Sequence, residues 1–265
     1  MLNNQKIRES FDSFFRQIGL KTENSNADQL AKMEQLVAYL EIIQSQVRKY
    51  SSKREITLIE SCAGNCYLSF LVYYYFTEIN PRKVKIYCID HNERLMEKCN
   101  NKAEAFGFEN MYFHAGDVLS FQEGNDPHLV YSLHACDDAT DRTIYLGIIK
   151  NAKNILSVSC CQHSIKKFFS TKSYKSLTRH RVFKDRLLYM VGDSMRTLLM
   201  EMSGYSADVI EFVSSRYTNK NAMIRARKGT PKLKTLAKSE YEELSNEFRI
   251  RPKLENYLIE SNSVM

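Results

Sequence analysis

Side chains able to do acid–base chemistry follow two short apolar segments in the middle of the chain. His134 comes just after the segment that begins at Leu129, and Cys161 and His163 come just after the segment that ends at Ser159. A histidine whose pKa lies near the working pH can accept a proton from an attacking oxygen or nitrogen atom. We therefore predict a catalytic group of His134, His163 and Cys161, in which the histidines act as the base or position an acceptor.

Three earlier segments end in residues that suit a nucleoside-containing cofactor. The small side chains of residues 61–64 let a ligand approach the backbone of a tight turn. Asp90 ends the next segment, where a carboxylate can accept hydrogen bonds from a ribose diol. Asp117 follows the third segment, where an acid can bind an adenine amino group. The predicted cofactor-binding residues are Glu60, Ser61, Cys62, Gly64, Asp90, His91, Asp117, Val118 and His134.

Each of these positions also has a purely structural interpretation. An aspartate at the end of a strand commonly caps a helix or closes a turn. Asp137 and Asp141 are expected to cap the helix predicted at residues 138–150, with the orientation of a histidine as the alternative for Asp137. A turn of small residues can simply pack a helix against a sheet, and Cys160 and Cys161 can be small residues at a crowded strand end. Polar groups at the carboxyl ends of three consecutive parallel strands nevertheless favour a ligand site, because such ends share one edge of the sheet.

Cysteine and histidine together raise the question of a metal site. Suitable ligand atoms are offered by Cys136, Cys160, Cys161 and His163. Adjacent cysteines rarely both reach one tetrahedral zinc ion, and the chain contains no Cys-x-x-Cys pair. The sequence therefore predicts no metal.

Short apolar segments alternate with helical patterns around all of these residues. Such alternation indicates βαβ units and a parallel sheet. The predicted strands are 56–61, 84–90, 111–114, 129–133 and 154–159, followed by an antiparallel hairpin of 207–214 and 222–228. The predicted helices of this region are 67–78, 92–106, 138–150, 165–174 and 181–202. The expected fold is a Rossmann-like α/β domain with a mostly parallel seven-stranded sheet and a closing antiparallel hairpin.

Helical patterns also flank this α/β region on both sides. Residues 1–52 are predicted to form an N-terminal helical extension packed on the core, with two amphipathic helices. Residues 53–230 are predicted to be the cofactor-binding domain, and residues 231–265 a C-terminal helical tail.

Two later motifs carry a resemblance to a known family. Residues 134–141 read His-Ala-Cys-Asp-Asp-Ala-Thr-Asp, and residues 160–163 read Cys-Cys-Gln-His. They resemble class I S-adenosylmethionine-dependent methyltransferases of the "methyltransferase domain 32" type, which include uncharacterised bacterial members. They are also similar to His-Leu-Cys-Gly-Ala-Ala-Thr-Asp and Cys-Cys-His-His segments in the catalytic domain of eukaryotic tRNA 2′-O-ribose methyltransferases. The resemblance implies S-adenosylmethionine as the cofactor.

The chain departs from the family pattern at two places. Against an acid followed by three alternating glycines, Glu60 and Gly64 match, whereas Cys62 and Cys66 stand at the outer glycine positions. Gln162 stands where the tRNA enzymes carry a first histidine. The first departure keeps open the alternative of a catalytically silent module that binds cofactor or RNA, and a nicotinamide oxidoreductase is a more distant one.

Charge favours an anionic acceptor for the methyl group. The formal charge is +7, the isoelectric point is about 8.9, and clustered cations can displace counterions from phosphates. Residues 166–186 mix cations with aromatic rings, and a second basic group spans residues 225–238. We predict methyl transfer to an oxygen or nitrogen atom of RNA, either tRNA or rRNA. A solvated cationic face and a small-molecule or protein acceptor remain the alternatives.

The composition resembles that of ordinary soluble proteins, with 43% apolar and 26% charged residues. No apolar run approaches the roughly 18 residues that a membrane-spanning helix needs, and the first ten residues are polar. Seven cysteines, an odd number, fit a reducing compartment better than a fold held by disulfides. We expect a cytoplasmic protein with no membrane partner.

Overall fold

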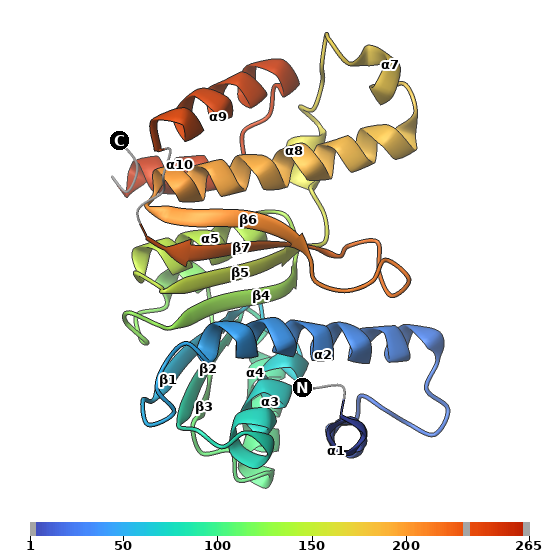
Figure 1. Cartoon of the computed structure of the whole chain (residues 1–265), viewed down its shortest axis with the longest axis vertical. Coiled ribbons are helices and arrows are strands. Elements are labelled where there is room, and N and C mark those ends of the chain that lie inside the picture. The colour runs from blue at the N-terminus through green and yellow to red at the C-terminus, as the bar shows by residue number, and fades with distance from the viewer. Residues whose placement is uncertain (1–3, 230–233, 262–265) are drawn as a thin grey trace. The chain divides into compact units, whose positions relative to one another are not determined.

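Two helices precede a region of alternating strands and helices in the computed structural model, which describes residues 4–229 and 234–261 (Figure 1). The chain divides into two compact units. The first comprises Met1–His128 and Glu211–Asn221, and the second comprises Leu129–Ile210 and Ala222–Met265. Among the described residues, no helix combines the length and the apolar character that crossing a membrane requires.

The predicted fold class is confirmed, since seven strands follow the order β3-β2-β1-β4-β5-β7-β6 of a Rossmann-like sheet. The paired strands β1, β2 and β3 are parallel, as are β4 and β5, whereas β7 runs antiparallel to β5. The strands are β1 (Ile56–Ser61), β2 (Val84–Asp90), β3 (Met111–Ala115), β4 (Leu129–Ala135), β5 (Asn154–Ser159), β6 (Tyr205–Glu211) and β7 (Ala222–Lys228).

In the first unit, the strand register brings the carboxyl ends of three strands to one edge. Ser61 of β1 pairs with Ile89 of β2, and Asp90 pairs with Ala115 of β3. The turns that carry the predicted cofactor-binding residues of this unit therefore leave the sheet side by side. The helical elements of this unit are α1 (Gln5–Gln17), α2 (Ala27–Val47), α3 (Tyr67–Tyr74) with the π-helical turn η1 (Tyr75–Ile79), α4 (Glu93–Ala105) and the 3-10 turn η2 (Val118–Ser120).

The two predicted N-terminal helices are present and have well-defined starts. Asn4 caps α1 by accepting from the backbone N–H of Lys6, and Asn26 forms a reciprocal capping box with Gln29 at the start of α2. The apolar face of α1 is buried, and the ring of Phe14 stacks on Tyr74 with centroids 4.2 Å apart.

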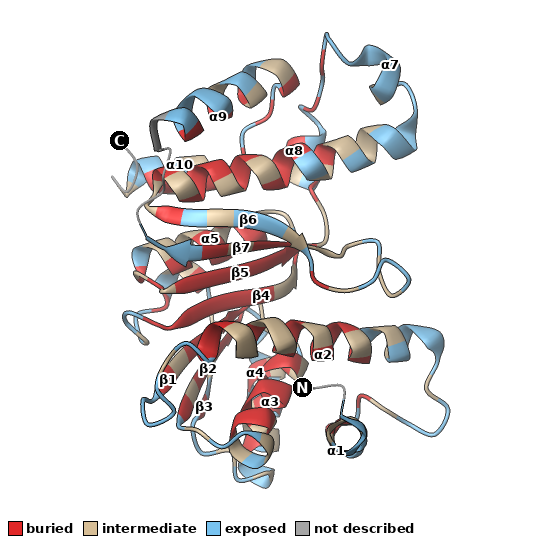
Figure 2. Ribbon diagram, viewed as in Figure 1, coloured by how far each residue is buried: buried red, intermediate tan, exposed pale blue. Residues whose placement is uncertain are grey.

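In the second unit, β4 and β5 are buried along most of their length (Figure 2), as expected for parallel strands covered on both faces. The described tail residues form two helices, while 231–233 and 262–265 lie outside the described residues. The helices of this unit are α5 (Asp138–Ile149), α6 (His163–Lys166), α7 (Lys175–Thr178), α8 (Arg181–Met202), α9 (Lys234–Phe248) and α10 (Lys253–Glu260).

The predicted helix at residues 165–174 is wrong, because the short helix α6 ends at Lys166 and the short helix α7 begins only at Lys175. Contacts with α9 hold the intervening chain instead. The carboxylate of Glu247 accepts hydrogen bonds from the hydroxyl groups of Thr171 and Ser173, and Phe169 stacks on Phe248. These tertiary contacts outweigh the local helical pattern.

Candidate functional site

In the turn after β1, every second residue has left-handed backbone angles. Cys62, Gly64 and Cys66 have φ angles of 57°, 52° and 53°. Left-handed backbone angles cost a residue with a side chain roughly 1–2 kcal/mol, whereas glycine adopts them without this penalty. The turn thus has left-handed backbone at all three positions of the glycine pattern, although cysteines occupy the outer two. Backbone strain of this kind persists where surrounding structure enforces it, often at ligand sites.

Open space adjoins the centre of this turn. A Cβ atom added at Gly64 would meet nothing within 4 Å, so the backbone there is accessible. The N–H of Gly64 donates to Asp90 Oδ2 over 2.8 Å. The structure therefore brings together the glycine of the first strand end and the acid of the second, as the sequence predicts for a ligand edge.

Asp90 anchors two turns at once. Its Oδ1 accepts from the backbone N–H of Asn92 over 3.0 Å, and His91 Nδ1 lies 3.3 Å from the same oxygen. Asp90 is buried, whereas the side chain of His91 is 91% exposed. A carboxylate has about four acceptor positions, so these two backbone bonds are compatible with further bonds to a ribose.

The third strand end carries the predicted pair Asp117 and Val118. Asp117 is exposed and caps η2 by accepting from the N–H of Leu119 over 2.8 Å, while Val118 is buried. Asp117 thus has the capping role that the sequence offered as the alternative to cofactor binding. The same hydrogen bond also fixes the Asp117 carboxylate at the end of β3.

Glu60 faces inward and ties β1 to the start of α3. Its Oε2 accepts from the N–H of Ser69 over 3.2 Å, and neighbouring Ser61 is also fully buried. Burial raises the pKa of Glu60 to about 8, because desolvation disfavours the charged carboxylate. At neutral pH this acid therefore holds its proton.

The raised pKa of Glu60 predicts a pH-dependent stability. Between its ordinary value of 4.5 and about 8, the folded protein holds a proton that the unfolded chain releases, so stability falls as pH rises. Relative to Glu60→Gln, the wild type should lose up to about 1.4 kcal/mol of unfolding free energy per pH unit in this window. Urea denaturation at pH 6 and pH 7 measures the difference, and a constant difference between the two proteins would contradict the assignment.

Three buried cysteines, Cys66, Cys88 and Cys99, lie together next to the turn at Gly64. The sequence did not indicate this cluster. Cys66 hydrogen-bonds with Cys88 and Cys99, and these contacts with burial raise the pKa of the Cys66 thiol. The Sγ atoms of Cys66 and Cys99 lie 3.7 and 3.9 Å from the carbonyl oxygen of Gly64. Cys66, Cys88 and Cys99 show no regular spacing in the sequence. Only the folded structure therefore reveals that their side chains lie together.

In the second unit, the end of β4 departs from regular strand geometry. The pairing with β5 shifts register between Leu133 and Ala135, and His134 at this bulge has a φ of 60°. Asp137 also has a positive φ, with φ of 53° and ψ of −110°. Bulges re-aim side chains next to active sites, and His134 is half-buried here.

Asp137 joins the ends of β4 and β5. Its carboxylate accepts from the N–H of Ser164 over 2.7 Å and from the Ser164 hydroxyl over 2.6 Å. The expectation that Asp137 caps α5 is therefore wrong, because the carboxylate turns to the start of α6. His163, the exposed first residue of α6, is thereby held near the strand end that carries His134.

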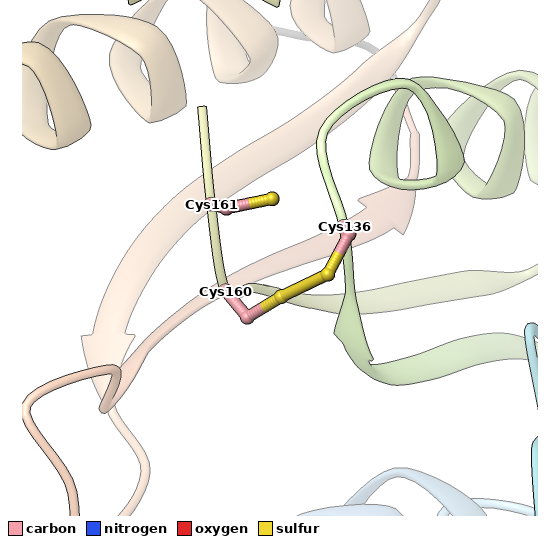
Figure 3. Close-up of side chains that lie close together, drawn as sticks. All are labelled: Cys136, Cys160 and Cys161. Carbon is pink, nitrogen blue, oxygen red and sulfur yellow. A yellow bond between two sulfur atoms is a disulfide. The ribbon is translucent and has the colours of Figure 1, made fainter. Parts of the chain in front are cut away.

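Cys136 and Cys160 are joined by a disulfide, which the expectation of reduced cysteines did not include (Figure 3). Cys161 is outside this bond, yet the Sγ atoms of all three cysteines lie within 4.8 Å of one another. The chain leaves strand geometry after Ser159, which allows the adjacent residues Cys160 and Cys161 to direct their sulfur atoms toward one place.

A buried ionic network, which the sequence did not predict, lies next to the end of β5. Gln162 is buried and its Oε1 accepts from Arg196 over 2.8 Å. Arg196 Nε also binds Asp141 over 2.7 Å, so Asp141 does not serve as the predicted cap of α5. The available signal was the spacing of Asp193 and Arg196, one turn apart on the buried face of α8.

A family model and several solved structures are similar to this chain. The model of the methyltransferase domain family matches residues 31–168, more than half of the chain. No curated protein matches the sequence. Solved structures with similar architecture include magnesium protoporphyrin IX methyltransferase from Synechocystis with bound S-adenosylhomocysteine, at 14% identity, a TM-score of 0.49, and coverage of 83% of this chain and 94% of that one. Another is an rRNA methylase from Streptococcus thermophilus, at 12% identity, a TM-score of 0.44, and coverage of 71% and 95%.

Proposed function

We propose that this chain, which belongs to the methyltransferase domain family and uses S-adenosylmethionine as its methyl donor, methylates RNA. The cofactor would be held in the first unit by the turn at Gly64, by Asp90 and by Asp117. The second unit would bind the acceptor, with His134 and His163 as the residues that position the attacking atom or accept its proton. A sulfonium donor leaves as a neutral thioether, so the reaction needs a well-placed nucleophile and a base more than an acid.

The distribution of positive charge along the chain is the main support for RNA as the acceptor. Residues 163–186 contain five lysines, three arginines and one acid, Asp185, which gives a formal charge of +7. The whole chain has the same formal charge of +7, so the remaining residues sum to zero. A charge concentrated in one segment acts on phosphates far more strongly than the same charge dispersed over a surface.

This basic segment is exposed and carries aromatic rings. Lys166 and Arg181 pair with Asp185, and further exposed cations are Lys167, Lys172, Lys175, Arg179 and Arg186. Exposed rings are Phe168, Tyr174 and Phe183. Cations bind phosphates while exposed rings stack on unpaired bases, which is how proteins grip single-stranded RNA.

One cation of the second basic group is paired, and this group carries fewer basic residues than the segment 163–186. Arg225 of β7 forms a bidentate ion pair with Asp208 of β6, so its charge is already balanced within the sheet. We therefore assign the principal phosphate contacts to the basic segment that follows β5.

Labelled methyl transfer tests the proposed function directly. The full chain is incubated with methyl-labelled S-adenosylmethionine and, in separate reactions, with total RNA, total protein and a small-metabolite extract. Label in nuclease-sensitive RNA is the expected result. Label confined to protein or metabolites would reject RNA as the acceptor, and cofactor binding without label in any pool would favour a silent module.

Neutralising the basic segment should weaken RNA binding in a salt-dependent manner. For the triple variant Lys172→Ala, Lys175→Ala and Arg179→Ala, we expect the slope of log affinity against log salt to decrease by about 2, at about 0.7 per phosphate contact on a single strand. Fluorescence anisotropy with a labelled oligoribonucleotide at several salt concentrations measures this slope.

A matched variant separates this segment from general surface charge. Arg16, Lys53 and Lys83 are exposed cations of the first unit, and replacing all three with alanine removes the same net charge. This control should retain the wild-type slope. Equal slopes for both triple variants would show that RNA binding does not depend on the basic segment.

A further inference from the structure

Three cysteines lie close together at the carboxyl ends of β4 and β5. The Sγ atoms of Cys136, Cys160 and Cys161 all lie within 4.8 Å of one another (Figure 3). On a tetrahedral zinc ion with bonds of about 2.3 Å, two thiolates lie roughly 3.8 Å apart. Cys136 and Cys160 are bonded to each other, so their sulfur atoms become separate ligands only after reduction. The three sulfur atoms already lie within 4.8 Å of one another, so only a small movement would give the thiolate spacing, and the adjacent cysteines do not diverge.

The backbone that carries these sulfur atoms is held on both sides. The hydroxyl of Tyr189 donates to the carbonyl oxygen of Cys160 over 2.9 Å. Gln162, one residue past Cys161, is fixed by Arg196 and Asp193 in the buried network. Such support is typical of sites that hold ligand atoms in place before the ligand arrives.

The chain is also anchored around Cys136. The N–H of Ala139 donates to its carbonyl oxygen over 2.9 Å, while His134 and Asp137 on either side have positive φ angles. Positive φ angles are unfavourable for residues other than glycine, and these two residues lie within four positions of each other. Strained backbone of this kind often occurs at functional sites. Here it lies directly beside the three clustered sulfur atoms.

We propose that Cys136, Cys160 and Cys161 form, when all three are reduced, a binding site for a soft transition-metal ion of the Zn²⁺ type. A small-molecule thiol reductant first supplies two electrons and two protons to the Cys136–Cys160 disulfide, giving two thiols while the reductant is oxidised to its own disulfide. Binding of the metal then displaces a proton from each thiol. Three protein ligands leave one tetrahedral position for water.

The third cysteine argues for a metal site over a purely structural disulfide. A disulfide needs two sulfur atoms, whereas Cys161 is placed beside the pair and is partly accessible. Within residues 4–229 and 234–261, no other group of three His, Cys, Asp or Glu residues brings its ligand atoms this close together. Thiolate ligands select zinc and other soft ions over magnesium or calcium.

Metal titration of the reduced full-length chain tests the proposal without any methyl-transfer reaction. The protein is stripped with a chelator, reduced with a phosphine under anaerobic conditions, and titrated with Zn²⁺ in competition with a chromophoric chelator. Co²⁺ then serves as a spectroscopic probe, because thiolate coordination produces charge-transfer absorption. We expect one equivalent to bind and each of Cys136→Ser, Cys160→Ser and Cys161→Ser to weaken binding at least 10-fold.

Two further variants keep the result interpretable. Cys62→Ser removes a partly exposed cysteine outside the cluster and should bind Zn²⁺ as the wild type does. Cys161→His replaces one ligand type with another and should retain most of the affinity. Failure of the wild type to bind Zn²⁺ after reduction, or unchanged binding by Cys161→Ser, would overturn the proposal, and both results are independent of the acceptor of the methyl group.

Discussion

Replacing Arg196 with methionine is expected to lower the free energy of unfolding by about 3–5 kcal/mol. Arg196 is fully buried and binds Asp141, Asp193 and Gln162. Removing the guanidinium leaves two buried carboxylates without a cation. Burial raises the pKa of both carboxyl groups and Arg196 only partly offsets this effect, so the network depends on its single positive charge.

A surface ion pair provides the control for this substitution. Arg225→Met breaks the pair with Asp208 on the exposed side of the sheet, and such pairs contribute about 0–1 kcal/mol. Chemical denaturation of both variants gives the comparison. In the double variant Arg196→Met and Asp193→Asn, removal of one buried charge should recover part of the lost stability. A cost for Arg196→Met no larger than that for Arg225→Met would show that the network does not stabilise the fold.

The same network connects stability to the site. Asp193 accepts from the hydroxyl of Ser159 over 3.0 Å and from Gln162 Nε2 over 3.1 Å, so α8 holds the chain on both sides of Cys160 and Cys161. Asp141 Oδ2 accepts from the N–H of Lys253 over 3.1 Å, which fixes the start of α10. One buried arginine and its two aspartate partners thus link β5, α5, α8 and α10 within the second unit.

The strands were the part of the fold most accessible from the sequence. The predicted bounds 56–61, 84–90 and 154–159 coincide with β1, β2 and β5, because a strand buried on both faces needs an apolar run and ends where small or polar residues begin. The stretch 165–174 failed for the opposite reason. Its structure depends on Glu247, which is 76 positions from Thr171, and no local pattern reports a contact over that distance.

The positions of the candidate site residues at strand ends followed from the sequence, but their partners did not. The sequence placed Gly64 and Asp90 at neighbouring ends, and their hydrogen bond agrees with that placement. The pairing of Asp137 with Ser164 and of Asp141 with Arg196 was hidden, because an aspartate at a helix start has a local capping role that the sequence favours. Side-chain pairing between distant segments depends on burial, which only the folded structure specifies.

Asp90→Asn is expected to weaken cofactor binding by about 10- to 150-fold, which corresponds to the 1.5–3 kcal/mol of a hydrogen bond to a charged group. In the carboxylate, one oxygen accepts from Gly64 N–H and the other from Asn92 N–H. An amide keeps one acceptor oxygen and turns the other position into a donor, so one of the two backbone donors would face an N–H₂ group. The ribose would also lose a charged acceptor.

Calorimetric titration with S-adenosylhomocysteine measures this loss, and thermal melting of the cofactor-free protein separates its two causes. A lower affinity with unchanged melting would assign Asp90 to the ribose, whereas lower values of both would assign it to the support of the turn at Gly64. Glu93→Gln removes an exposed negative charge from the first turn of α4 and should leave the affinity within about twofold, since exposed charges act weakly through water. Wild-type affinity in Asp90→Asn would contradict both roles, because each requires a carboxylate that accepts hydrogen bonds through both oxygens.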